Sequence, residues 1–403
     1  MHRGNPSLTG VVQSSGLRRF QQVKWELEGQ FAVHLPLVAG HDLIYATWLT
    51  GMHVEIHAME KATGTVRWLW KPGQNEYAGQ AHLHLDQGML YYPVYAVQAQ
   101  PGTHVALLRE AFLSAFDAQT GQVLRHIPIP PLGNRLMGKL FTMHEGVVYL
   151  NGMDSAPSPS AHYSCAAVDL QTEKLLWMTD MGVRLYSTSP VVAHGMVYLQ
   201  TYDAARGRQS LMHLHALNAQ TGAHVWEYEC ERGLVRDFAV AGTDIFVISG
   251  GLEVIDALRG TRKWHLPFQR SALNGPPTIT DEFIYLSYEG FPTWIEGKPH
   301  QTGEMVVLER ASRQQQWSAK ADEGQSGTEG AIVAGELLYA VWEQFDARPA
   351  VINATLFALD LGTGQEYWRF DATELSVPLV TDGNVFLVRG QGEGMSTFLC
   401  ALT

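Results

Sequence analysis

Acidic and amide side chains that recur along the chain are the first residues whose types could do chemistry. Carboxylates can act as general acids or bases, and they can hold cations. Each of these residues follows a stretch of alternating apolar residues and begins a short turn, where a carboxylate accepts backbone N–H groups. The periodicity therefore predicts a structural role in turns. The set is Glu60, Asp117, Asp169, Asn218, Asp256, Glu309 and Asp360.

A second set of polar side chains lies at the starts of strands that a ring-shaped repeat fold would turn inward. Asp237, Asn274 and Glu329 come from successive repeats, and their oxygen atoms are of the kind that binds Ca²⁺. His82 and His84 share one face of a strand, but a zinc site needs at least a third ligand. We predict that this set lines a wet channel mouth, with no catalytic residue and no metal site. The set is His34, His82, Lys139, Arg236, Asp237, Asn274, Glu329 and Glu374.

The acidic series belongs to an internal repeat, which must position every candidate residue. Typical copies are IHAMEKATGTVRW (56–68), LHALNAQTGAHVW (214–226) and LFALDLGTGQEYW (356–368). Each contains an alternating strand, the acidic or amide residue, a glycine where a hairpin needs positive φ, and a closing tryptophan. Glu173 and Arg313 replace the glycine, and Arg125 replaces the tryptophan of the second copy. The closing tryptophans are Trp25, Trp68, Trp177, Trp226, Trp264, Trp317 and Trp368.

Two more strands precede each copy, so one repeat predicts a four-stranded blade whose strands are named A to D from the axis outward. The chain opens with an isolated D strand, VKWELEG (23–29), and ends with a blade, residues 372–403, that lacks one. Pairing the two would remove both exposed sheet edges. We therefore predict an all-β, eight-bladed β-propeller of antiparallel blades over residues 21–403, preceded by a flexible tail at 1–20.

The B–C connections vary in length, whereas the C–D turns are short and uniform. Because B–C and D–A connections emerge on the same face of a propeller, we expect this loop face to bind partners. Trp294 lies outside the repeat register and either packs its own loop or anchors a partner. Aromatic side chains dominate protein-binding hot spots. The loop candidates are Tyr95, Tyr163, Tyr202, Phe291, Trp294 and Phe345.

Composition narrows the classes of partner. A net charge of −12 over 403 residues argues against nucleic acid, which selects clustered Lys and Arg. No apolar run is long enough for a signal peptide core or a membrane-spanning helix, so we expect no membrane insertion within this chain. Three cysteines predict free thiols or at most one bridge. We expect a monomer.

The pattern x-A-x-D-x-x-T-G-x-x-x-W resembles the PQQ-type quinoprotein propeller repeat over residues 21–403. The resemblance implies that each tryptophan packs between neighbouring blades, often over the small residue of the alanine column. It also implies one of two functional classes. One comprises dehydrogenases that hold pyrroloquinoline quinone (PQQ) and Ca²⁺ at the channel mouth. The other comprises non-enzymatic scaffolds, such as the outer-membrane β-barrel assembly lipoprotein, and sensor-like domains.

The dehydrogenases of that family are longer and carry large inserts, which this chain lacks. We therefore expect a non-enzymatic scaffold or sensor that engages a protein or peptide through the loop face, with no cofactor. The alternative is a PQQ- and Ca²⁺-dependent oxidoreductase, or a small-ligand binder, at the channel mouth. The resemblance suggests a bacterial extracytoplasmic or membrane-tethered location, while the missing signal peptide leaves the cytoplasm open.

Overall fold

The structure is a computed structural model of the whole chain, and it contains strands and turns. The described residues include no helix, and so none that could cross a membrane. They are residues 10–33, 35–50, 53–78, 81–99, 106–129, 141–153, 162–182, 185–186, 189–202, 212–230, 238–249, 251–267, 275–288, 293–295, 298–300, 303–322, 325–327, 330–345, 351–390 and 397–403.

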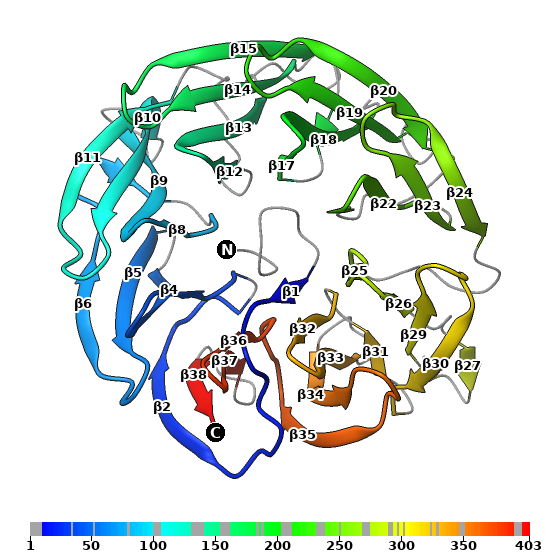
Figure 1. Cartoon of the computed structure of the whole chain (residues 1–403). Helices are drawn as coiled ribbons and strands as arrows, with labels where there is room; N and C mark the ends of the chain where they lie inside the picture. The colour runs from blue at the N-terminus through cyan, green and yellow to red at the C-terminus, as the bar shows by residue number, and fades with distance from the viewer. Residues whose placement is uncertain are drawn as a thin grey trace.

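The described strands form eight antiparallel blades around a central axis, as predicted (Figure 1). Blade 1 contains, from the axis outward, β3 (Val38–Ala39), β4 (Leu43–Thr50), β5 (His53–Glu60) and β6 (Val66–Trp70). Blade 2 contains β8 (His84–Asp86), β9 (Met89–Ala99), β10 (Ala106–Asp117) and β11 (Val123–Pro128). Blade 3 contains β12 (Phe141–His144), β13 (Val147–Met153), β14 (Tyr163–Asp169) and β15 (Leu175–Gly182). Blade 4 contains β17 (Val191–Ala193), β18 (Met196–Tyr202), β19 (Met212–Asn218) and β20 (His224–Cys230).

The second half of the ring repeats this order. Blade 5 contains β21 (Ala239–Ala241), β22 (Asp244–Ile248), β23 (Gly251–Asp256) and β24 (Arg262–Pro267). Blade 6 contains β25 (Thr278–Ile279), β26 (Phe283–Tyr288), β29 (Glu304–Glu309) and β30 (Gln315–Lys320). Blade 7 contains β32 (Ile332–Ala334), β33 (Leu337–Phe345), β34 (Val351–Asp360) and β35 (Glu366–Ala372). Blade 8 contains β36 (Leu379–Thr381), β37 (Asn384–Gly390), β38 (Thr397–Leu402) and β2 (Val23–Gly29).

Closure of the ring follows the prediction, because β2 from the N-terminal end is the D strand of blade 8. It pairs antiparallel with β38, with Trp25 opposite Ala401 and Leu27 opposite Leu399. The Gln21 N–H donates to the Thr403 carbonyl at 2.8 Å, so the two ends of the blade meet. The pairing covers the edge that β38 would otherwise expose.

The expectation that residues 1–20 form a flexible tail is wrong for residues 10–20. β1 (Val11–Val12) pairs parallel with β32, the innermost strand of blade 7. The Leu17 carbonyl accepts a hydrogen bond from Trp368 Nε1 at 2.7 Å. In other blades a C–D turn supplies this carbonyl, but blade 8 joins the two chain ends and has no such turn. The segment before β2 takes its place.

The repeat tryptophans pack between blades, as the resemblance implied. The indole N–H of a tryptophan donates to the carbonyl that follows the acidic turn residue of the next blade. These bonds are Trp25 to Lys61 at 2.9 Å, Trp68 to Ala118 at 3.0 Å, Trp177 to Ala219 at 2.9 Å, Trp226 to Ala257 at 3.1 Å and Trp317 to Leu361 at 3.2 Å. They link each of these blades to its neighbour.

The residues that depart from the repeat pattern contact residues of the neighbouring blade. Arg125 replaces a tryptophan, and its Nη1 donates to the Leu170 carbonyl at 2.9 Å, the same kind of acceptor. Glu173, which replaces the turn glycine of the next blade, lies 3.6 Å from Arg125. Arg313 replaces the glycine opposite Trp264, and its guanidinium lies 5.0 Å from the centre of that indole ring. An ion pair and a cation–π contact thus substitute for indole packing on glycine.

The acidic turn residues have the predicted structural role. Asp117 Oδ1 accepts hydrogen bonds from Gln119 N at 3.0 Å and from both Thr120 N and Thr120 Oγ1 at 2.8 Å. The same contacts from Thr172 hold the pKa of Asp169 below its usual value, and those from Thr363 act likewise on Asp360. Hydrogen bonds to the ionised form lower a carboxyl pKa. These carboxylates therefore hold their turns in place through hydrogen bonds.

Candidate functional site

The predicted channel-mouth residues fall mostly outside the described part of the chain. His34, Lys139, Arg236, Asp237, Asn274 and Glu329 lie there, so the wet channel mouth without a metal site stays a prediction, and a Ca²⁺ or quinone site stays its alternative. Of the two that are described, His82 is half-buried just before β8 and Glu374 is exposed between β35 and β36. His84 is buried in β8, with its ring centre 4.1 Å from that of Phe141 in blade 3. Burial lowers the pKa of His84 well below its usual value, so this ring is neutral.

Two of the predicted loop aromatics belong to the core instead. Tyr95 and Tyr163 are only 4% and 0% exposed, which leaves these rings no surface for a partner. The reason is that β9 runs to Ala99 and β14 begins at Tyr163, so both residues lie inside strands where connections were expected. Tyr202, the last residue of β18, is half-buried. Phe291 lies outside the described residues, as do the side chains of Trp294 in β27 (Thr293–Ile295) and Phe345 in β33.

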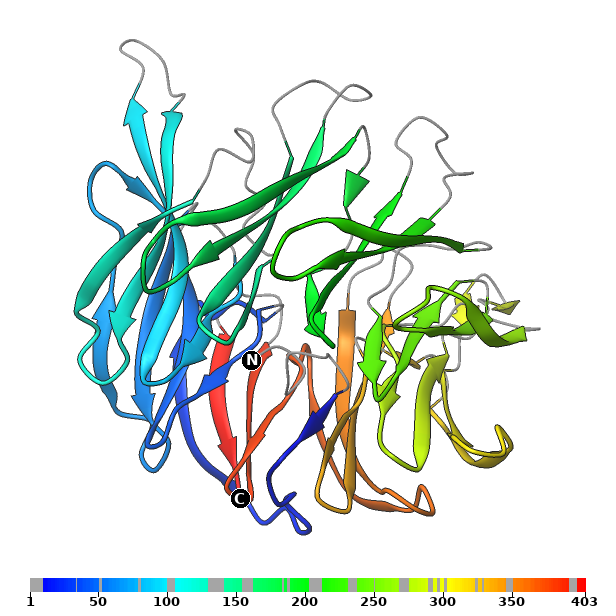
Figure 2. The same ribbon diagram turned by 45° about the horizontal axis from the view of Figure 1, so that its top comes forward.

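The two faces of the ring differ in how far the strands extend. The B–C hairpin of blade 2 is built from strands of 11 and 12 residues, and that of blade 7 from strands of 9 and 10. The B and C strands described in the other blades have five to eight residues. Figure 2 shows the β9–β10 hairpin rising above the disc on the face opposite the C–D turns.

Short extra strands support this loop face. Three of them pair with the C-terminal half of a B strand, which is the half nearest the loop face. They are β7 (Glu76–Tyr77), β16 (Leu185–Tyr186) and β31 (Gln325–Gly327). In blade 6 the B–C connection forms its own hairpin from β27 and β28 (Lys298–His300). The loop face therefore contains ordered β structure that extends the blades beyond the common ring.

A cleft of about 580 Å³ opens on the opposite face, beside the turns of blades 8, 1 and 2. Its charged lining is largely paired: Lys61 Nζ lies 2.7 Å from Asp382 Oδ2, and Arg67 Nη1 lies 2.8 Å from Glu60 Oε1. With acids and bases balanced along its walls, the cleft favours no class of charged ligand.

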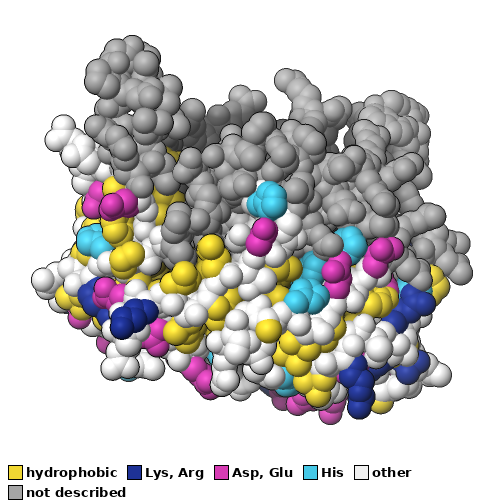
Figure 3. All heavy atoms as spheres, turned by 90° about the horizontal axis from the view of Figure 1, so that it is seen from above, with side chains coloured by type: hydrophobic (Ala, Val, Ile, Leu, Met, Phe, Trp, Pro, Cys, Tyr) yellow, Lys and Arg dark blue, Asp and Glu magenta, His cyan; other side chains and the backbone are white. Residues whose placement is uncertain are grey.

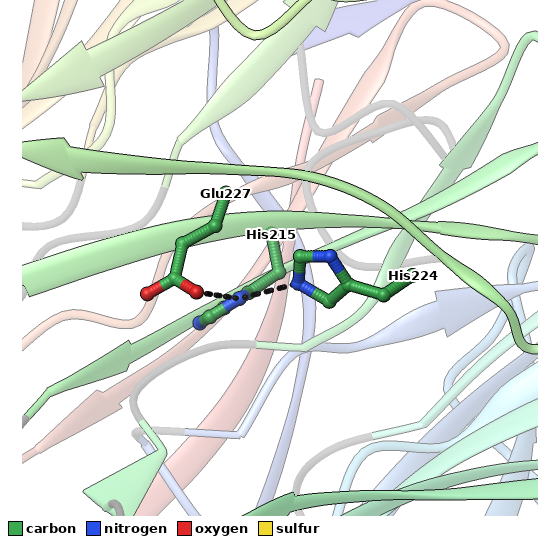
Figure 4. A group of neighbouring side chains, drawn as sticks. All are labelled: His215, His224 and Glu227. Atoms are coloured by element: carbon green, nitrogen blue, oxygen red, sulfur yellow. Dashed lines mark hydrogen bonds and ion pairs between the residues drawn. The ribbon is translucent and has the colours of Figure 1, made fainter.

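A cluster of histidines and a glutamate on the outer part of blade 4 was missed by the sequence analysis. Figure 4 shows His215 of β19 between Glu227 and His224 of β20. His215 Nδ1 lies 3.3 Å from His224 Nε2 and 3.9 Å from Glu227 Oε2. Histidine and acidic side chains lie close together on the edge of the disc that Figure 3 presents. Among the described residues, this is the one group of three ligand-type side chains within reach of a single ion.

The repeat contains a signal that could have revealed this cluster. In most C strands a small residue, such as Ala216 in blade 4, pairs with the closing tryptophan of the D strand. The residue before it points to the other side of the blade and also pairs with the D strand, as His215 does with Glu227. That position is polar in four of the eight copies and differs between them. Its occupants are His57, Ser114, Ala166, His215, Glu253, Val306, Phe357 and Cys400.

Comparison with known families shows which family the repeat belongs to. A family model described as outer membrane protein assembly factor BamB matches residues 166–290, 210–341 and 301–399. These overlapping matches cover more than half of the chain. The chain belongs to this family of PQQ-type repeats. Its eight blades and tryptophan contacts are those of a PQQ-repeat propeller.

Solved structures share the propeller over nearly its full length. The quinohemoprotein alcohol dehydrogenase of Comamonas testosteroni is 12% identical with a TM-score of 0.67, covering 99% of this chain and 79% of its own. The related enzyme ADHIIG of Pseudomonas putida HK5 is 12% identical with a TM-score of 0.64, covering 100% and 80%. BamB of Moraxella catarrhalis is 14% identical with a TM-score of 0.56, covering 94% and 99%. At such identities the likeness shows the fold alone. A comparison with curated proteins gives no match.

Proposed function

We propose that this PQQ-repeat propeller is a non-enzymatic scaffold that binds a protein or peptide partner through its loop face. The observation that carries the proposal is the one-sided extension of the blades, most marked in β9–β10 and β33–β34. Extended hairpins add surface on one face while the turns of the other face stay uniform. Variable connections on a rigid repeat scaffold are the usual place for binding residues.

The extent of the matches agrees with this proposal. BamB of Moraxella catarrhalis is covered over 99% of its chain, whereas the two quinohemoprotein dehydrogenases are covered over 79% and 80%. About a fifth of each dehydrogenase therefore has no counterpart here. The description of the matching family names an assembly factor, and assembly requires contact with other proteins.

The cysteines and the repeat carboxylates, which could act as nucleophiles or bases, have other roles in the described part of the ring. Cys165, Cys230 and Cys400 are free and buried. Burial raises the pKa of Cys165 and of Cys400 to about 12, so both stay protonated thiols and poor nucleophiles. The repeat carboxylates accept turn hydrogen bonds, as Asp117 does. These observations favour binding over covalent chemistry.

Adding PQQ and Ca²⁺ tests the proposal against the quinoprotein alternative. We expect an unchanged quinone absorbance spectrum and a melting temperature that stays within about 1 °C, because a scaffold gains nothing from a ligand it does not bind. A Ca²⁺-dependent spectral change with one quinone bound per chain, and a raised melting temperature, would overturn the proposal. The variant Asn274→Ala would then lose the effect if the quinone occupied the channel mouth.

A further inference from the structure

We propose that His215, His224 and Glu227 form a binding site for a divalent transition metal of the Zn²⁺ class on the outer part of blade 4. Neutral imidazole nitrogens and a carboxylate oxygen are ligands that suit such ions. The proposal is independent of the partner that the loop face binds.

The backbone brings the three side chains to one place. β19 and β20 pair antiparallel with His215 directly opposite Glu227. A register shift between Ala216 and Leu217 places His224 opposite Leu217, one residue earlier than regular pairing would allow. The same shift occurs in other blades, for example between Ala115 and Phe116 of blade 2. The bulge therefore belongs to the repeat, while the three ligands belong to blade 4.

Blades 3, 5 and 6 serve as internal comparisons for these positions. Blade 3 has Ala166, Leu175 and Met178 there, and blade 6 has Val306, Gln315 and Ser318. Blade 5 has Glu253, Arg262 and His265, in which Arg262 Nη1 lies 3.6 Å from Glu253 Oε2. Apolar, uncharged polar and ion-paired sets are thus all compatible with the fold. Blade 4 combines two imidazoles and a carboxylate, with no Lys or Arg at these three positions.

The distances match a metal's coordination sphere. Zn–N bonds of roughly 2.0–2.1 Å in a tetrahedron place ligand atoms about 3.3–3.5 Å apart. His215 Nδ1 and His224 Nε2 are 3.3 Å apart, and the three ligand atoms all lie within 4.8 Å of one another. Small side-chain adjustments of the exposed His224 and Glu227 would complete the geometry. Their exposure leaves the fourth position open to water.

Neighbouring groups orient the ligands. Thr201 Oγ1 lies 2.8 Å from His215 Nε2, so the hydroxyl oxygen can accept a hydrogen bond from the Nε2–H group, and the Nδ1 lone pair is then left for the metal. His213 Nδ1 lies 2.8 Å from Glu227 Oε1, which leaves Oε2 facing His215. Partners of this kind fix the tautomer and rotamer of metal ligands. His215 is itself only 1% exposed, so its ring is held in place.

Zn²⁺ titration of tag-free protein, followed by calorimetry against a competing chelator, tests the site. We expect one Zn²⁺ per chain, and a Zn²⁺-dependent rise in melting temperature. His224→Ala should weaken binding by about 100-fold or more, and His213→Gln by about tenfold. Because His224 is exposed, the metal-free melting temperature of His224→Ala should match that of the original chain.

His41→Ala is the matched control, since the His41 side chain is 89% exposed and lies in blade 1, between β3 and β4, away from the blade 4 cluster. It should bind Zn²⁺ as the original chain does. Visible absorption of bound Co²⁺ gives a second readout, because tetrahedral nitrogen and oxygen ligation produces intense bands. Absence of stoichiometric binding, or binding that both His224→Ala and Glu227→Gln leave unchanged, would overturn the proposal.

Discussion

Deletion of residues 1–29 is expected to destroy the closed ring. The deletion removes β2, so β38 loses its antiparallel partner and exposes a row of unpaired backbone groups. It also removes Trp25, whose indole packs on Gly64 and donates to the Lys61 carbonyl of blade 1. Trp25 is half-buried, so the loss of its side chain costs up to about 3–5 kcal/mol, and loss of the whole strand costs more. We expect a fall in melting temperature of about 10 °C or more, and aggregation seen by size-exclusion chromatography.

A chain that lacks only residues 1–9 is the length control for this deletion. It keeps β1, Leu17 and β2, and with them every closing contact described above. Its melting temperature should match that of the full chain. If the chain without residues 1–29 stayed monomeric with an unchanged melting temperature, closure by β2 would be refuted.

Gly222→Ala is expected to destabilise the protein by about 3 kcal/mol. Two effects add: the residue has φ +70°, and a Cβ atom there would lie 2.5 Å from the Trp177 ring. A left-handed non-glycine residue and an overpacked contact each cost about 1–3 kcal/mol. The change in free energy of unfolding is measured from the urea midpoint followed by tryptophan fluorescence.

Gly195→Ala separates the two effects within the same blade. Gly195 has φ +69°, but a Cβ atom there would meet nothing within 4 Å. It should cost only the backbone part, about 1 kcal/mol. Equal effects of the two substitutions would show that contact with Trp177 contributes nothing, contrary to the packing described above.

The fold could be predicted from the sequence because each blade repeats the same local rules. The acidic residue, the glycine and the closing residue of each repeat are separated by constant spacings, as Asp117, Gly121 and Arg125 are in blade 2. These spacings alone predict where the turn, the hairpin and the packing residue lie. The structure adds a second reason for the glycines, which is the close approach of the preceding blade's tryptophan. That contact joins residues some 40 positions apart, such as Trp177 and Gly222, so no local pattern could reveal it.

The repeat pattern could not predict features that occur in one blade alone. The contact of Leu17 with Trp368 depends on the missing turn of blade 8, which appears only when the ring closes. Tyr95 and Tyr163 were placed in connections because strand ends lack a sharp signal where the hairpins are long. The cluster around His215 occurs in blade 4 alone, because the bulge is common to the blades while the side chains beside it vary from blade to blade.

The central claim is that the loop face binds a protein or peptide. Site-specific photo-crosslinking in the source cells is its most direct test. The photoreactive residue replaces Glu110 or Gln344 near the loop face, and Gln119 or Gln365 in the turns of the same two blades. The account predicts crosslinked protein from Glu110 or Gln344 and none from the turn positions. Crosslinks from Gln119 or Gln365 alone, or from no position, would contradict it.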